Sequence, residues 1–407
     1  GDVTLGGYLM VDVTGGEADF TGDKLMNVIT AGGSLSGQFD GFADNSAIFN
    51  FVPEYHYGNG DPDGNAMHLV IMPDNGKCSR TSGPLECIVR SYADLRAVPM
   101  ARVLDREFAA RPSSEISRLF YRLPTDEAAD RAAVEAMPLL SGGMVSAIEK
   151  TAERLNRMTP VRSCADLMTP GGNRLWVNIA QHRARQDAEA GATGRDADET
   201  LLALGAERCL REGTTQLGWL FGYAQSDIES RGNQSQHSAD ADQYQIGLYG
   251  SQRLGESLTL DFRAGYARAL VDGRRELVFA NRTARSSYSS NVFYAGAGLN
   301  FPMAAATPYM RVDLSTVRSS GYHESGAGVL NYTVESQKRN SAVLEAGLRF
   351  GTAPAGGRFT FGGRIAAGYE LLDSHDEITA AFEGIRNARF TTESPDYGRL
   401  RGTLELN

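Results

Sequence analysis

Residues 258–266 read Leu-Thr-Leu-Asp-Phe-Arg-Ala-Gly-Tyr, a stretch in which apolar and polar side chains alternate strictly. Alternation with a period of two is typical of a β-strand whose two faces meet different surroundings. Similar runs recur through the C-terminal half, for example at residues 217–223 and 244–248. Short turns such as 254–257 and longer polar stretches such as 226–240 lie between the runs. The C-terminal half is therefore predicted to be one large antiparallel β structure.

The alternating runs are compatible with two kinds of fold. In a soluble sandwich the apolar face packs against a second sheet, whereas in an outer-membrane barrel it meets lipid and the opposite face lines a wet pore. Three features favour the barrel. The runs are longer than the roughly five or six residues usual for soluble strands, and short and long connections alternate. Glycines also lie among the charges of the polar face, where they leave room for a threaded segment.

The polar faces of the runs supply the candidate functional residues. In a barrel these side chains line the pore, and charges of both signs there would hold a helix by hydrogen bonds and ion pairs. The pore-lining, helix-contacting candidates are Asp261, Arg263, Arg311, Asp313, Glu345, Arg349 and Arg364. Strand propensity alone enriches Tyr and Phe, but aromatic residues near the run ends are also candidates for membrane interfaces: Tyr223, Tyr244, Tyr266, Tyr309, Phe350 and Tyr369.

The region from about residue 92 to residue 168 has helical periodicity. Apolar residues recur at three- and four-residue steps at 100–108 and again at 116–123, which predicts amphipathic helices. A further helix is expected at about 143–158, where charged residues leave only a thin apolar stripe. It is either a linker surrounded by water or a helix inside a polar tube, and periodicity alone favours the linker. The residues that mark this helix are Ile148, Ala152, Leu155 and Asn156.

Residues 1–91 combine short β-rich runs with turn residues. Such strands suit the last rungs of a stacked β-structure whose earlier rungs lie upstream; a small sandwich is the alternative. Cys78 and Cys87 bracket a loop and are a candidate disulfide in an oxidising compartment, or else two free thiols. The state of Cys164 and Cys209 stays open. No signal peptide is visible at the first residues, and we expect the sequence to be part of a longer chain.

Composition and motifs exclude several functions. The chain has 407 residues, with 40 basic and 50 acidic side chains and a formal charge of -10, so it offers no electrostatic footprint for nucleic acid. Mean hydropathy is -0.31, and no apolar run approaches the roughly 18 residues of a transmembrane helix. Signatures of hydrolases, phosphate loops, zinc proteases and dinucleotide sites are missing, and the 6 histidines lack paired spacing. We therefore predict no catalytic residue, no cofactor and no metal, in a protein that is not an enzyme.

With these residues in view, the chain resembles the C-terminal part of a bacterial autotransporter, a type V secretion protein. Residues 27–39 look like the last rungs of a β-helical passenger, and residues 100–105 with 139–142 look like the helical junction of that family. The order and spacing of these stretches over nearly the whole chain carry the resemblance. Stretches that look like barrel strands of the family are 174–177, 245–250 and 345–350.

The resemblance implies a mainly β protein with three parts. Residues 1–91 would be the end of a passenger outside the cell, and residues 92–170 a helical linker. Residues 171–407 would form an antiparallel, twelve-stranded barrel in the outer membrane, with the helix at 143–158 threaded through its pore. About ten strand-like runs are present, without the family's final strands and terminal aromatic residue, so we expect the barrel to be truncated at the C-terminus of this sequence.

The function implied by the resemblance is that of a translocator unit, which anchors in the outer membrane and exports its own passenger to the cell surface. Expected partners are outer-membrane lipid, the passenger and, during biogenesis, the β-barrel assembly machinery and periplasmic chaperones. The chain is expected to act as a monomer and to bind no nucleic acid. A passive porin-like or ligand-binding barrel with a periplasmic N-terminal domain is the alternative.

One residue of the expected pore helix is a candidate for self-cleavage. Some autotransporters cut their passenger free at a junction asparagine inside the pore, and Asn156 is the one asparagine of the expected helix. No tandem asparagine accompanies it, which favours an ordinary polar helix residue.

Overall fold

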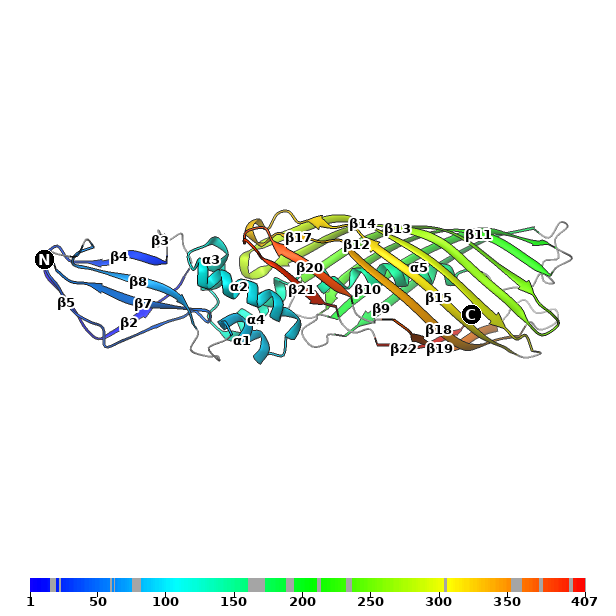
Figure 1. The fold of residues 1–407 in the computed structure, drawn as a ribbon, viewed down its shortest axis with the longest axis horizontal. Helices are drawn as coiled ribbons and strands as arrows, with labels where there is room; N and C mark the ends of the chain where they lie inside the picture. Colours follow the sequence, from blue (N-terminus) through cyan, green and yellow to red (C-terminus); the bar gives the residue numbers. More distant parts are fainter. Residues whose placement is uncertain are drawn as a thin grey trace.

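The structure of the chain is a computed structural model. Among the residues described, the molecule is elongated: a small β region carries the N-terminus, four helices follow, and a large curled sheet forms the other end (Figure 1). The described residues are 1–14, 20–21, 23–58, 61, 63–74, 82–159, 173–187, 194–210, 214–231, 236–303, 306–352, 361–372, 376–394 and 398–406.

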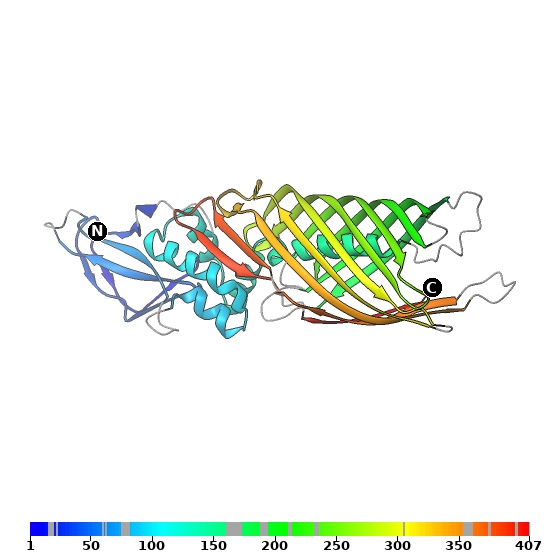
Figure 2. The ribbon, with the colours of Figure 1, turned by 45° about the vertical axis from the view of Figure 1, so that its right-hand side comes forward.

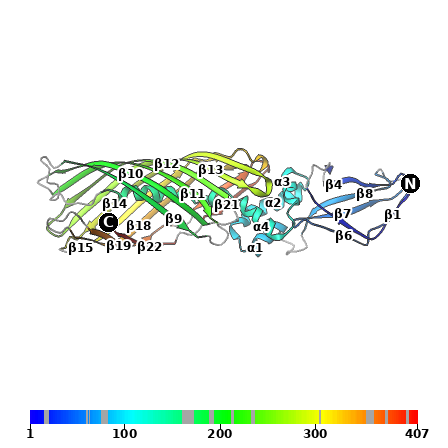
Figure 3. The same ribbon diagram turned by 180° about the vertical axis from the view of Figure 1, so that it is seen from behind.

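Among the described residues, the C-terminal half forms one antiparallel sheet of ten strands that curls into a half-barrel around a helix (Figures 1 and 2). The strands follow one another in chain order, with β9 and β22 at the two edges, and Figure 3 shows the wall seen from behind. The predicted antiparallel, barrel-type sheet is confirmed. Its strands are β9 (Asn173–Gln186), β10 (Gly194–Leu210), β11 (Thr215–Arg231), β12 (Gln236–Arg253), β13 (Thr259–Leu277), β14 (Arg282–Asn300), β15 (Ala306–Ser319), β18 (Gln337–Thr352), β19 (Phe361–Glu370) and β22 (Leu400–Leu406).

The half-barrel has a proximal part, next to the four helices, and a distal part, away from them. In the distal part the outward face is apolar: Leu248 of β12 is 66% exposed and Phe262 of β13 is 39% exposed. An apolar surface this extensive marks contact with lipid or with another protein. Further exposed apolar residues on the outward face are Leu175, Val177, Ile179, Leu217, Trp219, Phe221, Ile246, Phe293, Met310, Val312, Leu314, Leu344, Leu348, Ile365, Leu400 and Leu404.

The proximal part reverses the polarity of the two faces. On β13 its inward positions are Ala267, Ala269 and Val271, all buried, while the outward positions Arg268 and Asp272 are exposed. Strand β13 has 19 residues, whereas about 9–11 residues cross a bilayer. The strands therefore extend well beyond the apolar band. The sequence predicts a polar inner face. This prediction is wrong for the proximal part, because the residues there still alternate but the apolar ones point inward.

Outward tyrosines lie where the polarity changes. The Tyr223 hydroxyl donates to Asp242 at 2.6 Å, and the Tyr266 hydroxyl donates to Asn291 at 2.5 Å. Aromatic rings with one polar tip suit a membrane–water interface. Tyr309 departs from the interfacial prediction, because it faces the pore and is buried there.

Two long connections at the proximal end of the barrel together form a small sheet, which we call the rim sheet. It comprises β16 (Tyr322–His323), β17 (Tyr332–Val334), β20 (Glu377–Phe382) and β21 (Arg389–Glu393), in the order β16-β17-β20-β21. The short helices η6 (Val278–Ala280) and η7 (Gly328–Leu330) lie in the same region. In Figures 1 and 2 the rim sheet lies between the barrel wall and the four helices.

Four α-helices and two short 3-10 helices join the N-terminal β region to the barrel. Helices α3 and α4 begin with side-chain caps, because Ser114 and Thr125 accept hydrogen bonds from the backbone N–H of Ser117 and Ala128. The helical region begins at Pro84, inside the part that the sequence had assigned to β structure. Its elements are α1 (Pro84–Ser91), η2 (Leu95–Ala97), α2 (Val98–Ala110), α3 (Glu115–Tyr121), α4 (Asp126–Glu135) and η3 (Leu139–Gly142).

The N-terminal β region contains two kinds of pairing. Strands β1 and β5 pair in parallel, as do β2 and β6, with Val3 beside Leu35 and Tyr8 beside Gly41. Parallel pairs between successive coils are typical of stacked rungs. The remaining strands form an antiparallel sheet in the order β3-β4-β8-β7. The strands are β1 (Val3–Leu5), β2 (Tyr8–Val11), β3 (Phe20–Thr21), β4 (Lys24–Thr30), β5 (Leu35–Gly37), β6 (Gly41–Asp44), β7 (Phe49–His56) and β8 (Ala66–Pro73).

The structure also bears on membrane-spanning helices and on the cysteines. Among the residues that the structure covers, no helix is both long enough and apolar enough to cross a membrane. Cys87 and Cys209 are both disulfide-bonded. Cys78 and Cys164 lie outside the described residues, so the predicted pairing of Cys78 with Cys87 stays a prediction.

Candidate functional site

A single helix, α5 (Met144–Arg157), occupies the interior of the half-barrel (Figures 1 and 2). Most of its side chains are buried, including Ile148, Ala152, Leu155 and Asn156. Burial on nearly all sides of a helix with many charged residues is compatible with a polar tube and not with a solvated linker. The linker interpretation that periodicity favoured is therefore wrong.

The proximal half of α5 is held by apolar packing. Met144, Val145 and Ile148 pack in one buried cluster with small residues of the barrel wall. The wall residues of this cluster are Ala197, Ile228, Ala239, Ala241, Ala267, Ala269, Val271, Val292 and Val317. We call them the collar. Small side chains let the wall approach the helix closely, so the collar can seal the pore without charges.

Further along α5, Leu155 packs in a second apolar cluster, with wall residues that include Leu220. Gly222 lies opposite it, and a Cβ at that position would meet both Leu155 methyl carbons at 3.2 Å. That separation is tighter than ordinary van der Waals contact. The expectation that inward glycines make room for the helix therefore holds at Gly222.

Three buried ion pairs connect α5 to the wall. Arg154 Nη1 lies 2.6 Å from Glu199 Oε1 on β10, and the Thr151 hydroxyl donates to the same carboxylate at 3.0 Å. Arg339 Nε on β18 lies 2.8 Å from Glu149 Oε2. The third pair is Arg157 with Glu345, at 3.3 Å. Each carboxylate is almost completely buried and charge-paired, which is the condition under which a buried charge is tolerated.

Hydrogen bonds from side chains of the wall fix both ends of α5. Near its start, Arg195 donates to the carbonyl oxygen of Gly143 and to the Ser146 hydroxyl. At its end, Gln245 Nε2 donates to Asn156 Oδ1 at 2.7 Å, and Asn178 Nδ2 donates to the carbonyl oxygen of Met158 at 2.6 Å. Carbonyl groups at a helix end have no partner within the helix, so Asn178 provides a cap from the wall.

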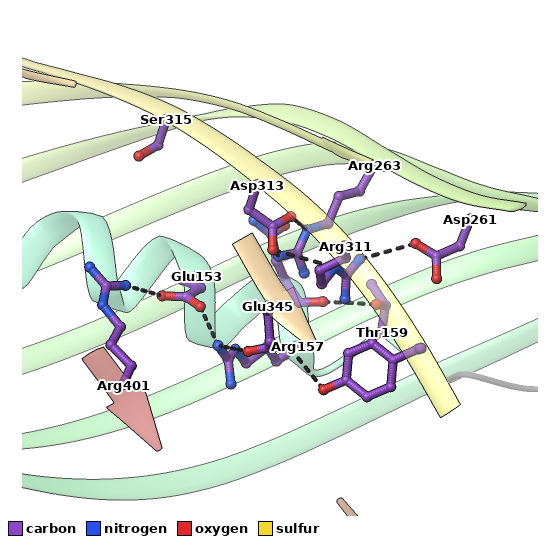
Figure 4. A network of polar contacts seen from close by, with 12 residues as sticks. Glu153, Arg157, Thr159, Asp261, Arg263, Arg311, Asp313, Ser315, Glu345 and Arg401 are labelled. Atoms are coloured by element: carbon purple, nitrogen blue, oxygen red, sulfur yellow. Dashed lines mark hydrogen bonds and ion pairs between the residues drawn. The ribbon is translucent and has the colours of Figure 1, made fainter. Parts of the chain in front are cut away.

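The seven charged residues predicted to line the pore all lie on the inner face, and Figure 4 shows five of them: Asp261, Arg263, Arg311, Asp313 and Glu345. Most of them pair with one another across strands: Arg263 with Asp313 at 2.8 Å, and Arg311 with Asp261 at 3.2 Å. Among the seven, Glu345 has a hydrogen bond to α5, through Arg157. The other two are Arg349, which donates to Asn300 at 2.7 Å, and Arg364, which lies 3.5 Å from Glu345.

The sequence reasoning missed the wall residues that hold the helix most directly, Glu199, Arg339 and Arg195. Glu199 is 4% exposed, in a strand where its neighbours of the same parity include Ala197, Leu201 and Ala203, all buried. A charged residue directly flanked by apolar residues on one strand face is the signal that would have found it. Its partner Arg154 could not be identified, because the depth and rotation of α5 are set by tertiary packing.

An open cavity of about 1760 Å³ lies beside the distal half of α5. Helix residues Lys150, Glu153 and Arg157 line it together with wall residues such as Asp261 and Arg349. Since residues of the distal turns also line it, the cavity opens at the end of the barrel away from the four helices. The interior is therefore filled in its proximal part and hydrated in its distal part.

One group of side chains outside the barrel has the arrangement of a metal site. Among the described residues, His56, Asp63 and His68 bring one ligand atom each to within 4.8 Å of one another. The Asn27 backbone N–H donates to His68 Nδ1 at 2.9 Å, so the neutral His68 ring carries its proton on Nε2 and has no lone pair left for a metal. The hydrogen bond with Asp61 raises the pKa of His56, which favours its charged form. The residues present therefore do not fit a metal ion in this state.

The C-terminal half matches a protein-family model, and three solved structures are similar to parts of the chain. The autotransporter beta-domain family matches residues 175–407. The translocator domain of the autotransporter NalP from Neisseria meningitidis is 15% identical, covering 65% of this chain and 96% of that chain with a TM-score of 0.49. The beta domain of the Bordetella autotransporter Brka is 17% identical, covering 58% and 96% with a TM-score of 0.40.

A third solved structure, the transport unit of the autotransporter AIDA-I from Escherichia coli, is 14% identical, covering 65% of this chain and 97% of that chain with a TM-score of 0.35. No curated protein sequence matches the chain. The assignment rests on the family match, which spans more than half of the chain and coincides with strands β9 to β22. The chain belongs to the autotransporter β-domain family: it is a translocator unit of the bacterial outer membrane, which serves to export a passenger to the cell surface.

Proposed function

We propose that α5 is the plug of this translocator, which closes the barrel once the passenger has passed. The observation that carries the proposal is the pairing of three charged residues of α5 with three different strands: Glu149 with β18, Arg154 with β10, and Arg157 again with β18 and with β22 through Glu405. Removing the helix would leave Glu199, Arg339 and Glu345 without these partners. A helix that only passed through in transit would gain nothing from such pairing.

The position of the N-terminal β region supports a direction of export. That region and the rim sheet lie at the same end of the barrel (Figure 1). We propose that this end faces the outside, that residues 1–91 belong to the passenger, and that residues 92–170 include the linker that returns through the pore. Protease shaving of intact cells should then remove residues near the N-terminus. Full protection of these residues would favour the porin-like alternative with a periplasmic domain.

The plug is tested by single-channel conductance of the full chain in planar bilayers. Deleting residues 144–157 should raise the conductance by about tenfold or more, because the hydrated pore of such a barrel is then open from end to end. Glu199→Gln, which removes the charge that holds Arg154, should give intermittent openings. Glu229→Gln is the matched control, because Glu229 is exposed on the outward face of β11. An unchanged conductance of the deletion variant would refute the plug.

The proposed function also includes the partners of the chain and the role of Asn156. We propose that the chain has no catalytic role of its own, acts as a single copy, and depends on the β-barrel assembly machinery and periplasmic chaperones during biogenesis. Asn156 is proposed as a structural residue, since its side-chain oxygen is already engaged by Gln245. Mass spectrometry of the mature protein should accordingly find the bond between Asn156 and Arg157 intact.

A further inference from the structure

We propose that the rim sheet is a folding platform: a surface, built by the barrel, on which the passenger-proximal helices α1–α4 fold after they leave the pore. This role goes beyond translocation. It rests on the proposed function only in that the rim faces the outside.

One continuous apolar core joins three parts of the molecule. It combines residues of the N-terminal sheet, of α1–α4 and of the rim sheet. Four phenylalanine rings trace it: Phe49 of β7 contacts Phe108 of α2 at 5.2 Å between centroids, Phe108 contacts Phe120 of α3 at 5.1 Å, and Phe120 contacts Phe279 of η6 at 5.2 Å. The helices therefore share their core with the barrel and do not enclose one alone.

Three of the four helices are too short to be stable in isolation. Helices α1, α3 and α4 have 8, 7 and 10 residues, whereas isolated helices under about 12–15 residues are marginal in water. Their stability must therefore come from tertiary packing of their apolar faces. Part of that packing is against the rim sheet, whose buried side chains include Tyr332, Phe382 and Phe390.

The C-terminal end of α4 is completed by barrel residues. The Ala136 carbonyl oxygen accepts from the Tyr332 hydroxyl at 2.7 Å and from Arg275 Nη1 at 3.3 Å. The Glu135 carbonyl oxygen accepts from His237 Nε2 at 3.3 Å. Carbonyl groups at a helix C-terminus need partners from outside the helix, and a cation there also interacts favourably with the helix dipole. Helix α4 therefore depends on donors that the barrel has already positioned.

Arg275 is the centre of this contact. It lies on β13, is 1% exposed, and pairs with Glu324 at 2.5 Å. It also donates to the carbonyl oxygen of Leu330 at 2.8 Å and lies over the Tyr332 ring at 4.6 Å. Glu324 accepts in turn from the Tyr332 N–H at 3.0 Å. These bonds lie within the barrel and its rim, so they can form before the helices arrive.

The rim sheet is also tied to the pore. Arg339, which pairs with Glu149 of the plug, has a second partner in Asp376 at 2.6 Å, one residue before β20. Asp376 is further fixed by the Ser394 hydroxyl, which accepts from its N–H at 2.8 Å. The base of the β20–β21 hairpin is therefore positioned by Arg339 of the barrel wall, before α5 adds Glu149 as the second partner of Arg339. A platform must be pre-organised in this way before it can template another segment.

The test follows refolding of the full chain by pulsed hydrogen exchange, after urea has unfolded the N-terminal part in detergent. The variant F382A/F390A removes two buried rings of the rim sheet. The control variant T379A/T391A removes a hydroxyl pair, at 2.8 Å, from the exposed face of the same hairpin. We expect amides of α1–α4 to gain protection about tenfold more slowly in F382A/F390A and at the wild-type rate in the control.

Two results would overturn the platform: a wild-type rate for α1–α4 in F382A/F390A, or protection of α1–α4 before β20 and β21 in the wild type. If amides of β11–β13 show that F382A/F390A does not assemble its barrel, Tyr332→Phe replaces it. That variant keeps the ring and loses the hydroxyl that caps α4, so slower protection of α4 supports the platform and an unchanged rate refutes it. Conductance measured on the same samples reports the plug separately, so failure of one proposal does not imply failure of the other.

Discussion

The distal and proximal parts of the half-barrel use the same strands with opposite polarity. In the distal part, outward residues such as Leu248 are apolar and inward residues such as Arg263 are charged. In the proximal part, the outward Asp240 is exposed, and the inward Ala269 is buried against α5. Strand alternation alone therefore does not fix which face is apolar. The solvent does: lipid surrounds one part of the barrel and water the other.

The comparison also explains how one helix can fill an uneven pore. The collar and the Glu149–Arg339 pair hold the proximal half of α5, while the distal half relies on the ion pairs of Arg154 and Arg157 beside a hydrated cavity. Apolar packing excludes water and ions, whereas ion pairs position the helix and are weakened by salt. The seal is therefore expected at the collar, and the orientation of the helix is expected to be set by the charges.

The largest effect is expected from a charge placed in the collar. Ala269→Asp should destabilise the folded barrel by about 3–5 kcal/mol, because the new carboxylate would be buried without a partner. The matched control is Arg268→Asp, one residue away on the exposed outward face, which should cost less than about 0.5 kcal/mol. Urea unfolding in lipid vesicles measures both. Equal effects of the two variants would contradict a dry collar.

The outward face gives the next largest effect. Leu248→Arg should cost about 2–4 kcal/mol if Leu248 lies deep in the bilayer, whereas Asp240→Arg on the same strand should be nearly neutral outside it. The difference between the two free energies of unfolding, measured in the same vesicles, locates the boundary between lipid and water along β12. If both substitutions are neutral, the distal outward face does not meet lipid.

A smaller, pH-dependent effect is expected in the helical junction. Burial and the neighbouring carboxylate of Asp94 raise the pKa of Asp130. The folded chain therefore keeps a proton that the unfolded chain has already lost, and stability falls as pH rises, by at most about 1.4 kcal/mol per pH unit. Burial raises the pKa of Asp105 only to about 6, so Asp130 dominates between pH 7 and 9.

The measurement is the protease resistance of residues 84–135 in the full chain at pH 7 and at pH 9. Wild type should be cleaved faster at pH 9. Asp130→Asn, which cannot acquire the charge, should show little difference between the two values. A loss of resistance with pH that is as large in Asp130→Asn as in wild type would show that another group is responsible.

Much of the fold could be predicted from the sequence, since it depends on local pattern. The runs around Leu248 and Phe262 have the period of strands, and the helices follow from three- and four-residue spacing. The reversal of polarity is also present in the sequence, because from Ala267 onward the apolar residues Ala267, Ala269 and Val271 occupy the inward positions of β13.

The contacts of the helix could not be predicted. Arg339 and Glu149 are 190 positions apart in the chain, and Arg154 meets Glu199 only because α5 has one rotation and one depth in the pore. These quantities depend on the volumes of many packed side chains and not on any local pattern. The charges inferred for the pore mostly pair with each other, for example Arg263 of β13 with Asp313 of β15, across Gly296 of the strand between them.

Outward residues of the distal strands are expected to meet lipid, whereas inward residues are not. The chain has 2 tryptophans, one on each face: Trp219 points outward and is 46% exposed, whereas Trp176 is 9% exposed and donates to the Tyr249 hydroxyl at 2.8 Å. The measurement is fluorescence quenching by brominated lipid in the variants Trp176→Phe and Trp219→Phe. Strong quenching of Trp219 with little quenching of Trp176 is predicted. Equal quenching of both, or quenching of Trp176 alone, would contradict the account.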